Sequence, residues 1–292
     1  MLIIGGPASN NLENEIADII GMRSLKVDYK IFPDGESYIR FPEKLEEDIV
    51  LIQSLFPPQD KHLIELFLMI DTAYNLGAER VIVVVPYMAY SRQDKRFLEG
   101  EAISIESILK IIEKLGTKYF LTVDIHKENS LKILSIPYIN IVPTVLFAEK
   151  IQELNLDNIV ILSPDAGGIG RARDVAEKIG CEYDFLEKRR DRISGEVRLR
   201  PKNIDVANKN IVIIDDIIST GGTISLAAKQ VIKNGARSVY VLCTHALLIN
   251  NAVKKILSSG VKEIIATNTI PNIYSKISVA PLIASVLNNL FK

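Results

Sequence analysis

Two adjacent carboxylates followed by a glycine-rich turn are the feature of this sequence best suited to chemistry. Residues 211–223 read IVIIDDIISTGGT, so four apolar residues run directly into Asp215 and Asp216. In an open α/β sheet such a strand carries its last residues to the edge where ligands bind. Gly221 and Gly222 allow a phosphate to approach the backbone closely, because glycine has no Cβ. The pattern predicts a strand-to-helix turn that binds a phosphate beside two carboxylates.

Other groups in this turn suit the same kind of ligand. Thr220 and Thr223 offer hydroxyl donors, and the helix that begins here offers free N–H groups at its positive dipole end. The carboxylates suit a sugar diol or a cation. An ordinary turn with a polar cap is the alternative interpretation, but two carboxylates placed directly after a buried strand need a partner.

Two further predicted strands end in possible ligands. Asp165 lies in SPDAGGIGRA, residues 163–172, where glycines precede a helix and an isolated carboxylate suits a metal or a ligand hydroxyl. His126, one of three histidines, follows the strand run FLTVD with Ile125 between them. A capping turn at Asp165 and a packed histidine at 126 are the alternatives. Their place after strands favours a ligand or metal role for both.

Two basic segments could contact phosphates. SRQDKRF, residues 91–97, is either a solvated loop or a nucleotide contact, since arginine offers paired donors to phosphate. FLEKRRDRISGEVRLR, residues 185–200, crowds like charges that repel each other unless an anion lies among them. An exposed basic loop is the usual explanation for the second segment. A mobile loop that closes over transferring phosphates is the sharper hypothesis.

A hairpin is predicted at IFPDGESYIRF, residues 31–41. Pro-Asp-Gly is a turn signal between two β-forming runs. The hairpin has either no role beyond structure, or it offers Asp34 and Glu36 as hydrogen-bond partners to a ligand in a neighbouring site.

Strands and helices are predicted to alternate along the whole chain. Apolar, β-branched runs predict strands, and amphipathic runs between them predict helices. The strand runs are 49–52, 81–85, 120–123, 159–162, 211–214, 239–242 and 264–266, and the helical runs are 63–76, 105–115, 146–154, 169–179 and 224–232. This order indicates an α/β fold with mainly parallel sheets flanked by helices.

The length of 292 residues and an internal repeat indicate two similar domains. Helix, Gly-Ala and buried strand follow one another at Gly77 and again at Gly235. We expect a boundary near Pro143, which gives domains 1–142 and 143–292. The amphipathic run 279–290 is a candidate to pack back on the first domain.

Charge and cysteine content restrict the function. With 35 Lys and Arg against 36 Asp and Glu, the net charge of -1 argues against a nucleic-acid binder. Cys181 and Cys243 have no metal-ligand spacing and are expected to be buried thiols in the reducing cytoplasm. Neither a signal peptide nor an apolar run of about 18 residues is present, so no membrane association is expected.

Six segments in order resemble the ribose-phosphate pyrophosphokinase family, also called phosphoribosyl pyrophosphate synthetases: FPDGE, SRQDKR, DIH, SPDAGG, EKRR and DDIISTGGT. DDIISTGGT alone fits many phosphoribosyltransferases, whereas FPDGE, RQD and KRR together are similar to the synthetase. The resemblance covers nearly the whole chain and implies two phosphoribosyltransferase-type domains. It also implies synthesis of 5-phosphoribosyl 1-diphosphate and AMP from ATP and ribose 5-phosphate with Mg²⁺, for nucleotide biosynthesis.

The resemblance assigns roles by position. The ribose 5-phosphate site would comprise Asp215, Asp216, Ser219, Thr220, Gly221, Gly222 and Thr223. The ATP site would comprise Phe32, Asp34, Gly35, Glu36, Arg92 and Gln93. The family's hairpin comes from a neighbouring subunit, which implies a homo-oligomer, at least a dimer, with a shared ATP site. His126 and Asp165 would be the magnesium-linked residues, and Lys188 and Arg190 the catalytic pair on a flexible loop.

Two departures from the family pattern stand out. Ser219 occupies a position where many members carry Asp, so any role of a carboxylate there is lost. FLEGEAISIES follows SRQDKR in place of the basic, serine-containing stretch tied to allosteric control in bacterial and animal enzymes. The sequence is more similar to the archaeal branch, and regulation by phosphate or ADP is not predicted.

Two other functions remain open at this point. A phosphoribosyltransferase that consumes phosphoribosyl pyrophosphate would hold the sugar phosphate on the same loop, but lacks the RQD and KRR segments. A non-catalytic partner or ligand sensor on this fold would be favoured by loss of the loop cations or metal residues, and these are present. The preferred mechanism is attack of the ribose C1 hydroxyl on the β-phosphorus of ATP in line with the departing AMP.

Overall fold

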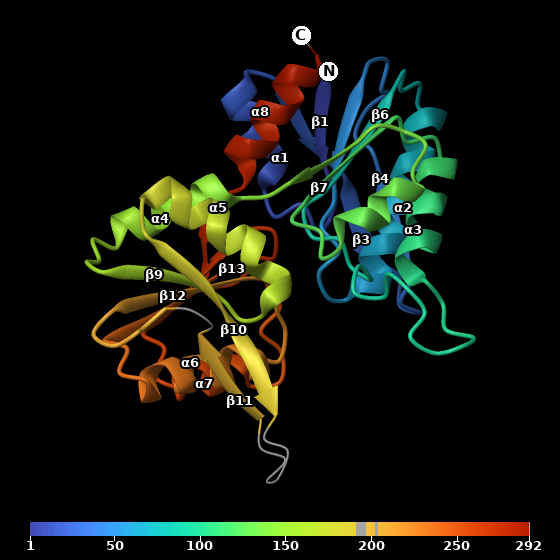
Figure 1. Cartoon of the computed structure of the whole chain (residues 1–292). Coiled ribbons are helices and arrows are strands. Elements are labelled where there is room, and N and C mark those ends of the chain that lie inside the picture. Colours follow the sequence, from blue (N-terminus) through green and yellow to red (C-terminus); the bar gives the residue numbers. More distant parts are fainter. Residues whose placement is uncertain (191–196, 202–203, 292) are drawn as a thin grey trace. The chain divides into compact units, whose positions relative to one another are not determined.

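Two sheets flanked by helices account for most of the computed structural model, which confirms the predicted α/β class (Figure 1). Residues 1–190, 197–201 and 204–291 are described, with the main chain alone for residues 188–190 and 197–201. The chain forms two units. Unit 1 comprises Met1–Val142, Thr269–Pro271 and Ser278–Lys292, and unit 2 comprises Pro143–Asn268 and Asn272–Ile277.

Unit 1 contains a sheet of order β2-β1-β5-β6-β7-β8 in which every neighbouring pair is parallel. Its strands are β1 (Leu2–Gly5), β2 (Arg23–Lys26), β5 (Ile49–Ile52), β6 (Val81–Val85), β7 (Tyr119–Val123) and β8 (Tyr138–Ile141). Its helices are α1 (Leu12–Ile20), α2 (Gln59–Asn75), α3 (Ser104–Lys114), the 3₁₀ helix η1 (Glu128–Ile133) and α8 (Ala280–Leu290). Every residue of β1, β5 and β6 is buried, as expected for parallel strands covered on both faces.

A separate antiparallel hairpin belongs to unit 1. It consists of β3 (Asp28–Ile31) and β4 (Ser37–Arg40), which pair only with each other in the described structure. The hairpin lies where the Pro-Asp-Gly signal predicts it.

The last helix, α8, packs within unit 1 against α1. Ile283, Ala284 and Leu287 of α8 are fully buried, as is Ile16 of α1. The Ser278 hydroxyl, just before α8, donates a hydrogen bond to the carboxylate of Glu15. The amphipathic pattern of α8 thus provides one wall of the core of unit 1.

Unit 2 contains a sheet of order β11-β10-β9-β12-β13-β14-β15, parallel except for the β10–β11 pair. Its strands are β9 (Ile159–Ser163), β10 (Glu182–Arg190), β11 (Val197–Pro201), β12 (Asn210–Ile218), β13 (Ser238–Ala246), β14 (Glu263–Thr267) and β15 (Ser275–Ile277). Its helices are α4 (Thr144–Glu153), the 3₁₀ helix η2 (Ala166–Gly168), α5 (Ile169–Ile179), α6 (Gly222–Lys233) and α7 (Ala252–Leu257).

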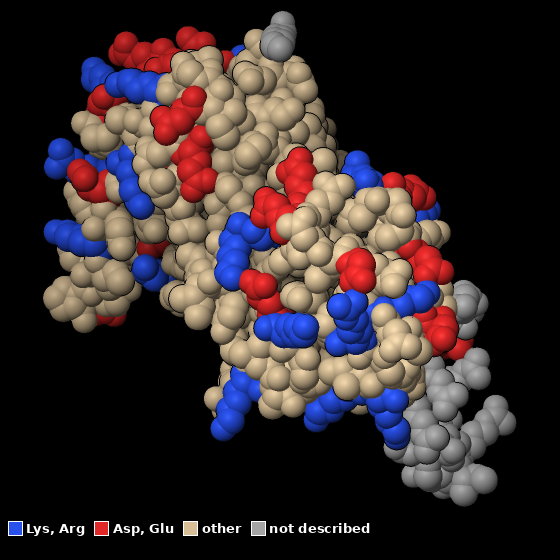
Figure 2. Space-filling model, turned by 90° about the vertical axis from the view of Figure 1, so that its left-hand side faces the viewer, with Lys and Arg blue, Asp and Glu red and all other residues tan. Residues whose placement is uncertain are grey.

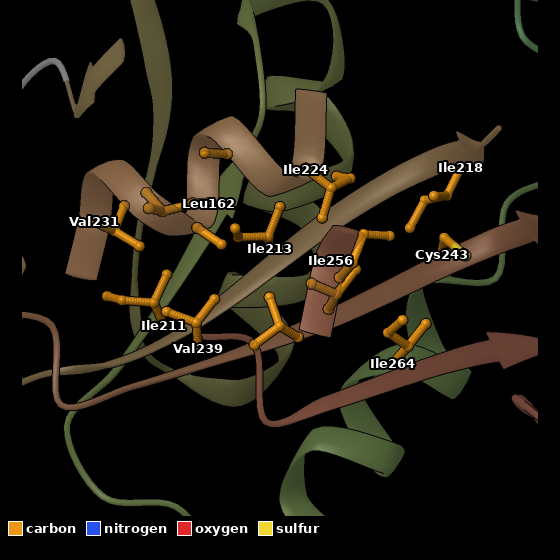
Figure 3. Close-up of a cluster of buried hydrophobic side chains, with 14 of the residues drawn as sticks. Leu162, Ile211, Ile213, Ile218, Ile224, Val231, Val239, Cys243, Ile256 and Ile264 are labelled. Atoms are coloured by element: carbon orange, nitrogen blue, oxygen red, sulfur yellow. The ribbon is translucent and has the colours of Figure 1, made fainter. Parts of the chain in front are cut away.

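Strand β12 has apolar side chains on both faces. Ile211 and Ile213 pack with Ile224 and Val231 of α6 and with Ile256 of α7 (Figure 3). The alternate residues of the strand belong to a second cluster, formed with α4 and α5. Each fully buried side chain of this kind stabilises the fold by about 1.5–3 kcal/mol relative to exposure. This packing fixes the two elements that flank the predicted phosphate turn.

Strand β12 is longer than its apolar run predicts. Pairing with β13 continues through Asp215 to Ile218, whereas pairing with β9 ends at Ile213. The two aspartates therefore lie inside the strand, beyond the point where β9 leaves its partner. Asp215 and Asp216 lie at the predicted carboxyl edge only on the β9 side, because β13 continues to pair beyond them.

Candidate functional site

The carboxylates of Asp215 and Asp216 are fixed by the backbone that follows them. The Asp216 N–H donates to Oδ1 of Asp215 at 3.0 Å, and the Ile217 N–H donates to Oδ1 of Asp216 at 2.9 Å. Asp215 is half-buried, and Asp216 is 7% exposed. Both side chains are thus oriented before any ligand arrives.

The pair has unusual proton affinity. Burial raises the pKa of Asp215 well above its usual range, the neighbouring carboxyl of Asp216 raises it further by charge and by hydrogen bonding, and Arg171 opposes the rise. Like carboxylates in contact resist simultaneous ionisation. A bound cation would oppose this rise in pKa, and sugar hydroxyls could donate hydrogen bonds to the carboxylate oxygens. The site therefore suits either ligand.

The turn after β12 presents backbone N–H groups to solvent. Gly221 precedes α6 with a φ of 70°, and no side chain caps the helix within the described ranges. Gly222 and Thr223, its first residues, are exposed, as is Thr220, while Ser219 is half-buried. Free N–H groups at the positive end of a helix form an anion site.

Glycine is required at position 221. A Cβ there would lie 2.9 Å from two side-chain carbons of Ile256 and 3.2 Å from the main-chain oxygen of Ala252. The positive φ adds a second reason, since side chains strain that conformation. At Gly222 a Cβ would meet nothing nearer than the Thr220 hydroxyl at 4.0 Å.

The carbonyl groups of the turn are held by the protein. The Ile249 N–H donates to the Ser219 oxygen at 3.1 Å, and the Ser225 N–H donates to the Gly221 oxygen at 2.9 Å. Between them, the Lys255 ammonium donates to the Thr220 oxygen at 3.0 Å. Three consecutive carbonyls are thus occupied, which leaves the N–H side of the turn for a ligand. No local sequence pattern marks Lys255 as part of this site, since it lies 35 positions from Thr220.

Asp165 caps its own turn. Its Oδ1 accepts hydrogen bonds from the N–H groups of Gly167 at 2.7 Å and Gly168 at 3.3 Å. The alternative capping interpretation thus describes its contacts, although the side chain is exposed. Its role toward a metal stays a prediction.

His126 is half-buried just beyond β7 in unit 1, and it has interactions of its own. Within the described part of the chain no three His, Cys, Asp or Glu side chains gather as a metal-binding group. Magnesium is commonly held by one or two carboxylates together with substrate phosphates. The residues present fit a magnesium ion held by one or two carboxylates and substrate phosphates, and the Asp215–Asp216 pair is the strongest set of donors.

The hairpin tip is internally ordered. The Phe32 N–H donates to the Glu36 oxygen at 2.8 Å, and the Gly35 N–H donates to the Phe32 oxygen at 2.9 Å. Gly35 has a φ of 97°, and Oδ1 of Asp34 accepts from the Glu36 N–H at 3.2 Å. These contacts define the path of the main chain from 32 to 36.

The aromatic ring at the tip is presented to solvent. Phe32 is 39% exposed and packs edge-on against Tyr38, with ring centroids 5.9 Å apart. The Lys30 ammonium lies 4.9 Å from both centroids. An exposed ring held in one orientation is suited to stacking on a planar base.

Glu101, which no sequence motif marks, organises the segment that carries Arg92 and Gln93. One Glu101 oxygen accepts from the N–H groups of Phe97 at 2.7 Å and Leu98 at 3.0 Å, and these bonds lower its pKa. The Gln93 amide donates to the Lys95 oxygen at 3.2 Å and to Glu101 at 3.4 Å. Arg92 is exposed.

The main chain of Lys188 and Arg190 lies on strand β10, opposite Leu199 and Val197 of β11, rather than in the expected loop. Their side chains lie outside the described part of the structure. The structure places the predicted ribose 5-phosphate residues in one continuous stretch, from the end of β12 through the turn to the start of α6. It distributes the predicted ATP residues over the hairpin and the 92–93 segment of unit 1.

Surface charge and helix hydropathy are properties of the whole chain rather than of single residues. On the face shown in Figure 2, basic and acidic side chains are interspersed over the visible surface. No helix within the described ranges has both the length and the apolar character that a membrane crossing requires.

Comparisons with known proteins cover both halves of the chain. The N-terminal domain of ribose phosphate pyrophosphokinase matches residues 1–116, and the phosphoribosyl transferase domain matches residues 130–275. The ribose-phosphate pyrophosphokinase of Saccharolobus solfataricus is 46% identical over 272 residues, covering 92% of this chain and 93% of its own. That of Sulfurisphaera tokodaii is 42% identical over 281 residues, covering 96% of each. The crystal structure of phosphoribosylpyrophosphate synthetase from Mycobacterium smegmatis matches with a TM-score of 0.89 and 27% identity, covering 99% of this chain and 98% of that one.

Proposed function

Because the chain belongs to the ribose-phosphate pyrophosphokinase family, an enzyme family, we propose that it transfers the diphosphoryl group of ATP to the C1 hydroxyl of ribose 5-phosphate. The products are 5-phosphoribosyl 1-diphosphate and AMP. The reaction supplies a precursor for nucleotide biosynthesis in the cytoplasm. Cys243 is buried as predicted, whereas Cys181 is only half-buried.

The observation that carries this proposal is the turn between β12 and α6. Its exposed N–H groups suit the 5-phosphate, and Asp215 and Asp216 suit the ribose hydroxyls or a cation that accompanies the diphosphate. Ser219, Thr220 and Thr223 add hydroxyl groups, and the two glycines keep the turn open to the phosphate. A short serine at position 219 contacts the phosphate without adding negative charge.

The nucleotide is proposed to bind on unit 1 residues. Phe32 stacks on the adenine, and the hairpin groups of Asp34, Gly35 and Glu36 hydrogen-bond the nucleoside. Arg92 and Gln93 complete this site. The hairpin serves the site of a neighbouring subunit, so the active enzyme is a homo-oligomer, at least a dimer. The exposed Phe32 ring and its fixed orientation support this assignment.

The reaction is a displacement at phosphorus. The C1 oxygen of ribose 5-phosphate forms a bond to the β-phosphorus while the bond from that phosphorus to the α-phosphate oxygen breaks, and the hydroxyl proton passes to solvent. Lys188 and Arg190 stabilise charge on the transferring group and on the departing AMP. Asp215 and Asp216 orient the sugar, which contributes through positioning.

His126 and Asp165 are the residues proposed to hold Mg²⁺. By the chemistry of their side chains, the carboxylates of Asp215 and Asp216 fit this ion best. The charge of a bound Mg²⁺ would neutralise part of the negative charge of the substrate phosphates. One oxygen of Asp165 accepts the capping hydrogen bonds, and the other has no hydrogen bond to any residue that the structure describes. A hard cation that keeps several waters needs only one or two such ligands.

The test is AMP formation from ATP and magnesium, with and without ribose 5-phosphate. We expect AMP only when the sugar is present, in equal amount to 5-phosphoribosyl 1-diphosphate. Sugar-dependent release of ADP, or no reaction, would contradict the proposal. Consumption of 5-phosphoribosyl 1-diphosphate with a purine or pyrimidine base would instead identify a phosphoribosyltransferase.

A further inference from the structure

A fully buried glutamate on α2 belongs to none of the sites described above. Glu65 is 0% exposed and accepts hydrogen bonds on both carboxylate oxygens. The Ser37 hydroxyl donates to Oε1 at 2.9 Å, and the Lys61 ammonium lies 3.2 Å from the same oxygen. The Gln53 amide donates to Oε2 at 3.2 Å. These partners offset part of the cost of burying a carboxylate.

These partners connect the hairpin to the edge of the sheet. Ser37 is the first residue of β4 and directly follows the proposed nucleotide-binding residues 32–36. Gln53 directly follows β5, where its amide oxygen also accepts from the Ala8 N–H at 2.8 Å. The Glu65 carboxylate therefore lies between the hairpin on one side and the carboxyl end of the sheet on the other.

The hairpin has few other attachments. All residues from 28 to 36 are exposed, and β3 and β4 pair only with each other in the described structure. Within the described ranges, the bond from Ser37 to Glu65 is the one side-chain hydrogen bond from either strand to another element. The Lys61 ammonium, paired with Glu65, also lies 5.6 Å from the Tyr29 ring centroid on β3. Glu65 thus holds one strand directly and the other through Lys61.

We propose that Glu65 is a positioning residue for nucleotide binding. It fixes the base of the hairpin and thereby the orientation of the Phe32 ring and the Glu36 backbone at its tip. This inference rests on the proposed function, since it takes the hairpin as part of the ATP site. Binding of ribose 5-phosphate, which is assigned to unit 2, does not depend on Glu65.

The first test compares Glu65→Gln with the unaltered enzyme. The neutral amide keeps the shape but weakens the contacts to Lys61 and Ser37, so KM for ATP is expected to rise roughly tenfold, as for loss of a hydrogen bond to a charged group. KM for ribose 5-phosphate stays within about twofold, because a remote contact is unaffected. Ser37→Ala shifts KM for ATP in the same direction, and the double variant adds little to Glu65→Gln alone.

Glu13→Gln is the matched control. Glu13 is another buried glutamate of unit 1, 1% exposed, and its carboxylate has no hydrogen-bond partner among the described residues. Its replacement tests the change from a buried carboxyl group to an amide without touching the hairpin. We expect no change in KM for ATP.

Hydrogen exchange of the amides in residues 28–40 gives a readout that does not require activity. Faster exchange there in Glu65→Gln, and not in Glu13→Gln, supports the anchor even if the unaltered protein makes no AMP, in which case the proposed function alone fails. If the unaltered enzyme makes AMP and Glu65→Gln keeps its KM for ATP, the positioning role is overturned. Equal rises in both KM values would also overturn it, because they would indicate a general folding role.

Discussion

The ammonium group of Lys255 donates a hydrogen bond to the main-chain oxygen of Thr220 at 3.0 Å, which joins α7 to the turn between β12 and α6. In return, the main-chain oxygen of Lys255 accepts from the Ser225 hydroxyl at 3.2 Å. The lysine thus places a positive charge beside the proposed phosphate site and holds a carbonyl that would otherwise be free to rotate toward the ligand.

Replacing Lys255 by methionine is therefore expected to weaken binding of ribose 5-phosphate. Loss of a charged hydrogen bond predicts a rise in KM for the sugar phosphate of roughly tenfold, with KM for ATP unchanged. Lys254→Met is the control, because its side chain is exposed on the same helix and its ammonium has no partner among the described residues. Equal kinetics for the two variants would show that the Lys255 contact does not position the turn.

Gly221→Ala is expected to destabilise the protein. The new methyl group would crowd Ile256 and the Ala252 oxygen at a φ of 70°, which predicts a loss of about 1–3 kcal/mol in the free energy of unfolding. Gly222→Ala adds its methyl group to open space, and we expect little change. Urea unfolding of both variants measures the difference. A small loss for Gly221→Ala would mean that the turn relaxes without cost.

Asp215 should make the ligand-free protein less stable as pH rises. Its raised pKa means that the folded state binds the proton more tightly than the unfolded state does. The contribution of Asp215 to the free energy of unfolding is complete below its pKa in the unfolded chain, about 3.9. It is lost as pH rises through the raised pKa of the folded state. Urea unfolding at several pH values should show this slope, and Asp215→Asn should remove it. Asp165→Asn should retain it, and an unchanged slope in Asp215→Asn would assign the titration elsewhere.

Lys188→Ala is expected to lower kcat by roughly 10³-fold or more, as removal of an arginine finger does in related transfers, with little change in KM. The reason is that charge on the transferring group develops in the transition state. Arg189→Ala, at the adjacent cation to which no role is assigned, should retain most of the rate. Steady-state kinetics with both substrates decides, and near-normal kcat in Lys188→Ala would remove its catalytic role.

Glu101→Gln is expected to loosen the segment that carries Arg92 and Gln93. The carboxylate accepts two backbone hydrogen bonds, which an amide can only partly replace. We expect KM for ATP to rise several-fold, in proportion to one weakened hydrogen bond. Glu99→Gln is the control, since Glu99 is exposed and has no side-chain hydrogen bond within the described part of the chain. The same KM for ATP in both variants would show that this segment does not contribute to nucleotide binding.

Local patterns predicted the parts of this fold that depend on neighbours in sequence. The strand at 81–85 and the helix at 169–179 have the predicted bounds, because apolar runs and helical periodicity mark them directly. The hairpin followed from Pro-Asp-Gly in the same way. The sequence predicts a ligand site at Asp215 and Asp216, because two charges beside a buried strand are unfavourable unless they have a partner.

Contacts between distant residues could not be predicted in this way. Ser37 and Glu65 are 28 positions apart, and Thr220 and Lys255 are 35 apart. In the sequence, Glu65 cannot be distinguished from any other glutamate on a helix. Its burial results from the packing of β4 and Gln53 against α2. Strand β12 exceeded its predicted length because β13 continues beside it beyond the apolar run.

The position of α8 has a consequence for biosynthesis. Every residue of unit 2 leaves the ribosome before α8 does, yet α8 forms part of the core of unit 1 beside α1. Until α8 is made, the part of unit 1 that is made first exposes the apolar face that includes Ile16. During translation that face has to remain unpaired for the whole time in which unit 2 is made, which makes the nascent N-terminal segment a natural client for chaperones.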